Sequence, residues 1–126
     1  MMQPPVPSIL PRETAAAMDT SVATDPATRP LIVDVREPDE FGQARIDGVV
    51  LMPISQFVAR HAELPKDRPL LMLCAAGSRS TSATMYLLQA GWTDVRNVTG
   101  GMIGWQAAGL PVRTGPPDPG EGDLPA

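Results

Sequence analysis

The sequence has little from which to build a cross-linked or metal-bound protein. Its 126 residues include a single cysteine, Cys74, and a single histidine, His61. One cysteine cannot form an internal disulfide, and the ligand spacing of zinc sites is absent. These absences exclude a secreted disulfide scaffold and a cysteine-built metal site, and we expect no metal and no other cofactor. A reducing compartment, the cytoplasm, fits this use of cysteine.

Long apolar segments and clusters of basic charge are missing as well. No stretch approaches the roughly 18 apolar residues needed to cross a bilayer, and the opening MMQPPVPSILP lacks the basic region and apolar core of a secretory signal. The net charge is −4, and the 10 basic residues are scattered along the chain, which leaves no electrostatic footprint for nucleic acid. We therefore expect a soluble protein whose ligand is a small molecule, with neither a membrane nor a nucleic acid as partner.

What is present suffices for one domain. A chain of 126 residues can bury a sizeable core. The residues outside 8–113 are rich in proline, glycine and acid and offer little to bury. The sequence therefore predicts a flexible N-terminus over residues 1–7, a single domain over 8–113, and a flexible tail over 114–126.

Apolar runs alternate with helical patterns along this domain, which is typical of a parallel α/β sheet. The clearest strands are LIVDV at 31–35 and LLMLC at 70–74, which are almost wholly apolar, as expected of strands covered by helices on both faces. Weaker strands are expected at 8–10, 49–52 and 94–98. Apolar spacing and end signals predict helices at 13–18, 38–43, 54–61, 80–88 and 102–108.

Two of these strands end on residues that can do chemistry. Asp34 and Cys74 each close an apolar strand, and ligands of α/β sheets bind at the carboxyl ends of the strands. Small residues and a helix start follow Cys74, so backbone N–H groups can turn inward and stabilise a thiolate, assisted by the cation of Arg79. We predict that Cys74 is a nucleophile. The predicted anion-binding loop consists of Ala75, Ala76, Gly77, Ser78, Arg79 and Ser80.

Cys74 and the polar residues that follow the other central strand can each also be explained by a purely structural role. A lone cysteine at a strand end is usually an inert, buried side chain; the loop, the arginine and the helix start together favour the nucleophile. Asp34, Arg36 and Glu40 of DVREPDEF either steer an anion and brace the loop or form a structural network. In that network Asp34 caps loop amides and Arg36 pairs with Glu40 across one helical turn. We favour the network for these three residues.

Three blocks of the sequence resemble the signature blocks of the single-domain rhodanese family of sulfurtransferases. They are LIVDVREPDEF at 31–41, LPKDRPLLMLCAAGSRS at 64–80 and NVTGGMIGWQAAGLPV at 97–112. The resemblance implies a three-layer α/β fold with a five-stranded parallel sheet and helices on both faces. It also implies that Cys74 takes sulfane sulfur from a donor such as thiosulfate, becomes a persulfide, and passes the sulfur to a thiophilic acceptor such as cyanide or a thiol.

The chain departs from the family pattern in two places. Arg45 and Asp47 stand where many members have histidine and proline, which puts in question details borrowed from that loop. Ala75 and Ala76 stand where thiosulfate-specialised members place cations. The groups left to attract a dianion are the loop amides, Arg79, Arg36 and Arg45. We expect measurable but modest thiosulfate:cyanide activity, with a neutral or protein-bound persulfide, such as that of a protein sulfur carrier, as the other donor class.

Three other functions stay open at this point. Related phosphatases of the cell-division-cycle type share the fold but carry a loop one residue longer, and the six-residue form of Cys74–Arg79 favours sulfur over phosphate. A non-catalytic docking module on the same fold commonly lacks the cysteine or the arginine, and both are present here. A thiol redox sensor is the third, because an accessible thiol of low pKa also forms sulfenic acid; the chain has no second cysteine to resolve it.

Overall fold

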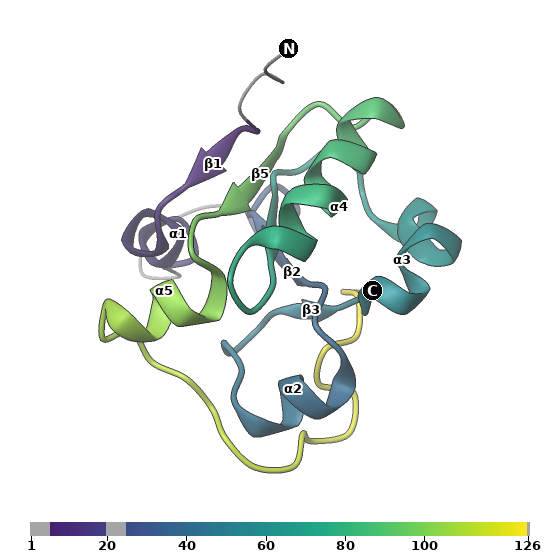
Figure 1. Cartoon of the computed structure of the whole chain (residues 1–126). Coiled ribbons are helices and arrows are strands. Elements are labelled where there is room, and N and C mark those ends of the chain that lie inside the picture. Colours follow the sequence, from purple (N-terminus) through teal and green to yellow (C-terminus); the bar gives the residue numbers. More distant parts are fainter. Residues whose placement is uncertain (1–5, 20–24, 126) are drawn as a thin grey trace.

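The computed structural model describes residues 6–19 and 25–125. Its five strands form one sheet, all parallel, in the order β1-β5-β4-β2-β3 (Figure 1). The strands are β1 (Ser8–Ile9), β2 (Leu31–Asp34), β3 (Val50–Leu51), β4 (Leu70–Leu73) and β5 (Val95–Val98). Strands β2 and β4 are buried along their whole length and occupy the middle of the sheet. The expectation of a flexible N-terminus falls mainly on residues 1–5, outside the described residues.

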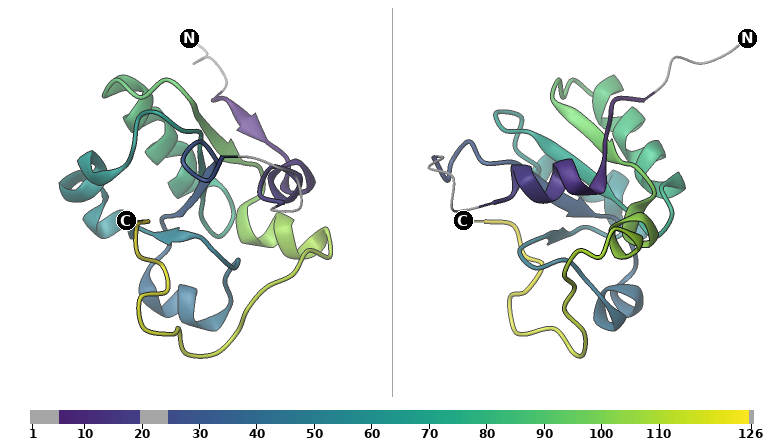
Figure 2. Two further views of the ribbon diagram at one scale, coloured as in Figure 1. Left: turned by 180° about the vertical axis from the view of Figure 1, so that it is seen from behind. Right: turned by 90° about the vertical axis from the view of Figure 1, so that its left-hand side faces the viewer.

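Helices cover both faces of this sheet (Figures 1 and 2). They are α1 (Pro11–Ala17), α2 (Pro38–Gln43), α3 (Ile54–Arg60), the 3-10 helix η1 (His61–Glu63), α4 (Ser78–Gln89) and α5 (Gly101–Ala107). Phe57 of α3 and Leu87 of α4 belong to the core on one face. Phe41 of α2 and Trp105 of α5 belong to the core on the other. The predicted three-layer α/β fold is confirmed.

Helix α4 begins two residues earlier than the sequence predicts. Its N-cap is Gly77, which adopts φ 110° and lets the chain enter the helix straight from the loop after β4. No side chain caps the first turn, and the hydroxyl of Thr81 donates to the carbonyl of Gly77 at 2.6 Å. The N–H groups of this turn are therefore not taken up by a capping side chain.

The C-terminal segment differs from the flexible tail that its composition predicts. Arg113 forms an antiparallel bridge with Arg45, and the amide of Leu51 in β3 donates to the carbonyl of Gly122 at 2.8 Å. Leu124 packs against the core. The segment thus runs along the β3 side of the sheet (yellow in Figure 1) and gives the edge strand a hydrogen-bond partner.

Arg45 holds this segment in place. It is 1% exposed, and its guanidinium donates to the carbonyl of Gly115 at 2.7 Å and to both carboxylate oxygens of Glu121. It also lies 5.4 Å from the centre of the Phe41 ring. The expectation that Arg45 helps to attract a sulfur donor is wrong, because burial and the ion pair commit its charge to the C-terminal segment.

We expect Glu121→Gln to lower the Tm at neutral pH, because it leaves the buried Arg45 without a counter-charge. The hydrogen bond from Arg45 lowers the pKa of Glu121 from 4.5 to about 2. Since the folded pKa is below the unfolded one, this stabilisation is fully present above the unfolded pKa and is lost as pH falls through about 2. Thermal unfolding between pH 7 and pH 2 checks this: the Tm difference between the two proteins should shrink with falling pH.

Glu63→Gln is the matched control, since it removes one carboxylate from the exposed Arg60–Glu63 pair. Such a pair contributes little, so the Tm of this variant should stay near that of the wild type. A Tm of Glu121→Gln equal to that of Glu63→Gln, or a difference that does not change with pH, would contradict the anchoring role of Arg45.

Candidate active site

Cys74 lies directly after β4, at the carboxyl end of a central strand, and is 1% exposed. The N–H of Gly77 donates to its Sγ at 3.0 Å, and the Oγ of Ser80 lies 3.2 Å from the same sulfur. The positive φ of Gly77 turns the loop back toward the cysteine and brings these donors within reach. The sulfur thus accepts a backbone N–H and lies next to a hydroxyl, rather than against apolar side chains alone.

The surroundings of Cys74 favour its thiolate. Burial is the largest influence and by itself raises the pKa of this thiol. The hydroxyl of Ser80 and the backbone N–H groups of Ser80, Gly77 and Ala76 act in the opposite direction and outweigh burial, so the pKa is lowered overall. A larger fraction of the sulfur is therefore ionised at neutral pH than in a free cysteine.

The start of α5 sets the direction of the loop peptides. The N–H of Met102 donates to the carbonyl of Cys74 at 2.9 Å, and the N–H of Ile103 donates to the carbonyl of Ala75 at 3.0 Å. In a trans peptide the C=O and the following N–H point in opposite directions. Because α5 takes the two carbonyls, the N–H groups of Ala75 and Ala76 point away from α5.

Gly101 makes this close approach feasible. It has φ +58°, and a Cβ at this position would lie 2.3 Å from the carbonyl oxygen of Cys74 and 2.8 Å from that of Ala75. The sequence indicates backbone freedom at the Gly100–Gly101 pair but gives no sign that α5 is hydrogen-bonded to the loop after Cys74. Only a residue without a side chain fits here.

Ser80 has a second partner that sequence reasoning missed. Its Oγ lies 2.5 Å from Oδ1 of Asn97, and the side-chain atoms of both residues in this hydrogen bond are buried. Asn97 comes from β5, where it pairs in register with Met72 of β4. A second polar residue next to Arg96 in the strand VRNV is the one signal that could have pointed to it.

Arg79 lies at the start of α4, and its charge is paired. Its two terminal nitrogens donate to the Glu40 carboxylate at 2.7 and 2.9 Å, and both side chains are about one third exposed. This hydrogen bond is the main reason that the pKa of Glu40 falls to about 2, and the pair also raises the pKa of Arg79. The pair joins α2 to the start of α4.

The expected pairing of Arg36 with the carboxylate of Glu40 is wrong. The guanidinium of Arg36 instead donates to the fully buried carboxylate of Asp34, at 2.8 Å for the closest contact. Its remaining hydrogen bonds go to the carbonyls of Glu40 and Ala44, at 3.2 and 2.8 Å. Asp34 also accepts the N–H of Arg36. Arg36 pairs with Asp34 because that carboxylate lies buried beside it, while the Glu40 carboxylate is taken by Arg79.

A pocket of about 360 Å³ adjoins these residues, and Ala75 of the loop after Cys74 is part of its lining. Arg36 and Glu40 line it together with Met102 and Ile103 of α5. Ile103 is 64% exposed. The structure thus brings Arg36, Glu40, the start of the loop and α5 to one pocket.

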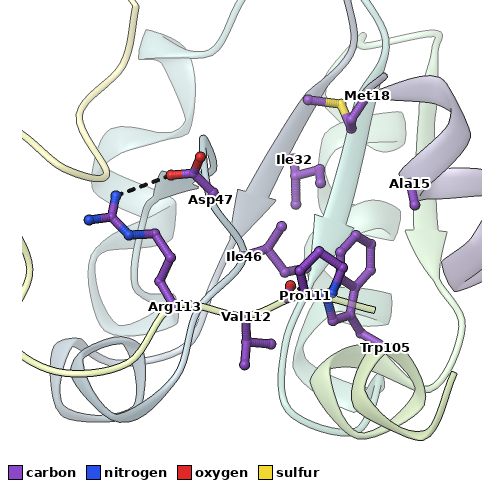
Figure 3. Close-up of a pocket in the computed structure, with 9 residues that line it drawn as sticks. All are labelled: Ala15, Met18, Ile32, Ile46, Asp47, Trp105, Pro111, Val112 and Arg113. Carbon is purple, nitrogen blue, oxygen red and sulfur yellow. Dashed lines mark hydrogen bonds and ion pairs between the residues drawn. The ribbon is translucent and has the colours of Figure 1, made fainter. Parts of the chain in front are cut away.

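A second pocket, of about 240 Å³, lies elsewhere (Figure 3). Its lining is mainly apolar and includes Ile32, Trp105 and Pro111, but no residue from 74–80. Asp47 is at its rim, paired with Arg113 at 3.2 Å. Asp47, which stands where many family members have proline, therefore lines this pocket and contacts the C-terminal segment.

Comparison with known proteins agrees with this geometry. The sequence model of the rhodanese-like domain family matches residues 13–108. The chain belongs to the rhodanese-like family. Among its relatives, a sulfurtransferase from Allochromatium vinosum is 40% identical over 82 residues, which are 65% of this chain and 77% of that protein. The thiosulfate sulfurtransferase GlpE of Actinobacillus succinogenes is 31% identical over 84 residues, 67% of this chain and 76% of that protein.

A solved structure shows the same rhodanese-like architecture. The rhodanese-related protein of Thermoplasma volcanium superposes with a TM-score of 0.74 at 28% identity, over 85% of this chain and 97% of that chain. The family predicted from the three sequence blocks is thus confirmed, and the sulfurtransferase relatives support sulfur transfer as the general activity. Among the described residues, no helix has the length and apolar character to cross a membrane.

Proposed function

We propose that this protein is a sulfurtransferase in which Cys74 carries sulfane sulfur, as a persulfide, from a donor to a thiophilic acceptor. The observation that carries the proposal is the setting of the Cys74 sulfur at the carboxyl end of a central strand, where the N–H of Gly77 donates to it and the hydroxyl of Ser80 lies within hydrogen-bond distance. A thiolate formed in this way needs no general base. The single cysteine and the absence of a resolving partner fit a transient sulfur carrier in a reducing compartment.

The chemistry takes two displacement steps. The Cys74 thiolate attacks the outer sulfur of the donor; a new S–S bond forms, the donor's bond to that sulfur breaks, and its electron pair leaves with sulfite or a thiolate. Cyanide or a thiolate then attacks the outer sulfur, and Cys74 leaves as the thiolate. Each step has an anion at the loop, which N–H groups directed at the sulfur stabilise. No cofactor is required.

The ion pairs of the arginines affect which sulfur donor the site can attract. Arg79 is paired with Glu40, Arg36 with Asp34, and Arg45 with Glu121. A dianion such as thiosulfate is therefore attracted mainly by neutral amides. The similarity to a thiosulfate sulfurtransferase supports thiosulfate as a usable donor, while the pairing supports a persulfide of lower charge, free or on a protein carrier, as the better one.

Thiocyanate formation from cyanide tests the proposal with two donors, thiosulfate and cysteine persulfide. We expect turnover with both, and a kcat/KM about tenfold higher for the persulfide, the effect of roughly one compensated charge near the surface. No thiocyanate from either donor, with a protein that unfolds cooperatively, would contradict sulfur transfer. A higher kcat/KM for thiosulfate would contradict only the donor assignment.

Glu40→Gln should raise the kcat/KM for thiosulfate several-fold at low salt. The amide keeps an oxygen for Arg79 and for the N–H of Glu37, which Glu40 now holds at 3.1 Å, but it removes the charge that neutralises the arginine. Salt screens such an effect, so the gain should fade at high ionic strength. Steady-state kinetics at low and high salt measure it, with Glu63→Gln as the control. An unchanged or lower kcat/KM at low salt would show that Arg79 does not act on the donor through its charge.

A further inference from the structure

Asn97 lies next to Ser80 and is not among the residues that line the pocket beside Ala75. It is 8% exposed, on β5 beside β4, and its Oδ1 is 2.5 Å from Oγ of Ser80. That Oγ is in turn 3.2 Å from the sulfur of Cys74. Asn97 thus reaches the nucleophile through one intervening hydroxyl, and neither the family resemblance nor the named relatives assign it a role.

The hydroxyl of Ser80 has one proton and three neighbours that can accept it. They are Oδ1 of Asn97, the carbonyl of Gly77 at 3.2 Å and the sulfur of Cys74. With Oδ1 nearest, the hydroxyl donates to Asn97 and presents lone pairs to the sulfur. This arrangement suits the thiol, which can donate S–H to Ser80. It does not suit the thiolate, which has no proton to donate and requires one from its neighbours.

An asparagine amide can meet the hydroxyl with either of its ends. A half turn about its Cβ–Cγ bond exchanges Oδ1 and Nδ2 with almost no change in shape. With Nδ2 toward Ser80, the amide donates to Oγ, and the hydroxyl proton is free for the sulfur. Donation into the oxygen also makes the hydroxyl a stronger donor, because hydrogen bonds in a chain polarise one another.

We propose that Asn97 is a positioning residue that sets the direction of the Ser80 hydroxyl, accepting its proton while Cys74 is a thiol and donating to its oxygen when Cys74 is a thiolate. The proposal rests on the proposed role of Cys74 as the nucleophile. The hydrogen bond from Ser80 to the sulfur then depends on Asn97, a side chain that takes no direct part in binding the sulfur donor or the sulfur acceptor. Removing the amide should therefore change the ionisation of Cys74.

The test is the pH dependence of Cys74 alkylation by iodoacetamide, which reports the thiolate without any sulfur donor. Asn97→Leu keeps the approximate volume and removes both polar atoms. We expect its alkylation midpoint to move to higher pH and its rate at neutral pH to fall about three- to tenfold, the effect of weakening one hydrogen bond to a charged group. Asn97→Asp, whose carboxylate accepts but cannot donate, should slow alkylation at least as much.

A double-variant cycle separates this role from a purely structural one. In a Ser80→Ala background, Asn97→Leu should leave the alkylation profile unchanged, because Asn97 acts only through the hydroxyl. An unaltered or faster alkylation of Asn97→Leu, or an equally large effect without the serine, would overturn the proposal. Thermal unfolding verifies that each variant is folded. If Asn97→Leu does not fold, Asn97→Asp takes its place in the alkylation test. Because no sulfur donor is used, the result is independent of whether sulfur transfer is found.

Discussion

Cys74→Ser should reduce thiocyanate formation to the uncatalysed background with thiosulfate and with cysteine persulfide alike. The serine oxygen is nearly isosteric and can still accept from Gly77 and meet Ser80, which now contact the sulfur at 3.0 and 3.2 Å. It remains protonated at neutral pH and cannot hold a persulfide. The fold should persist, since the change leaves the volume at this 1% exposed position almost the same.

The control for Cys74→Ser is Ser82→Ala, which removes an exposed hydroxyl one turn into the same helix, α4. Steady-state thiocyanate release and thermal unfolding should show wild-type behaviour for Ser82→Ala and a folded, inactive protein for Cys74→Ser. Turnover of Cys74→Ser clearly above background would mean that sulfur does not pass through this residue.

Gly101→Ala should produce the second largest effect. The new Cβ would lie 2.3 Å from the carbonyl oxygen of Cys74 and must push the loop and α5 apart. The hydrogen bonds from Met102 and Ile103 that orient the loop peptides would then be lost or lengthened. We expect kcat/KM to fall about 100-fold, the cost of a misplacement of about 1 Å, and the free energy of unfolding to fall by about 1–3 kcal/mol.

Gly109→Ala is the control that separates misalignment of the loop from backbone strain at the substituted residue. Gly109 has φ +73°, close to the +58° of Gly101, but a Cβ there meets nothing within 4 Å. Both variants carry the cost of an alanine in the left-handed region, while only Gly101→Ala disturbs the loop. Kinetics and denaturant unfolding should therefore show two less stable proteins and one loss of activity. Equal activity in the two variants would show that α5 does not position the loop.

The strands and helices could be predicted from the sequence because their signals are local. The apolar runs at 31–35 and 70–74 and the helical spacing after Pro53 specify elements that the structure reproduces within two residues. The position of Cys74 at the sheet edge follows from the same patterns, since parallel strands share their carboxyl edge. These inferences need no knowledge of which side chains meet across the fold.

The side-chain partners could not be predicted, because they are distant in sequence. Glu40 lies 39 residues from Arg79, and Arg45 lies 76 residues from Glu121. The composition of the C-terminal segment predicts a flexible tail. In the structure the segment pairs with the buried Arg45 through Arg113. Asn97 was missed for the same reason: its partner is Ser80, on another element, and a single polar residue in a strand does not say what it faces.

Intact-mass spectrometry before and after a sulfur donor tests the central claim most directly. Wild-type protein treated with cysteine persulfide, then freed of excess donor, should gain the mass of one sulfur atom, lose it on addition of cyanide, and release thiocyanate. Cys74→Ser should gain nothing. A gain of oxygen alone would indicate a redox sensor, and no change in mass with any donor would indicate a docking module; either result would contradict a sulfur-carrying Cys74.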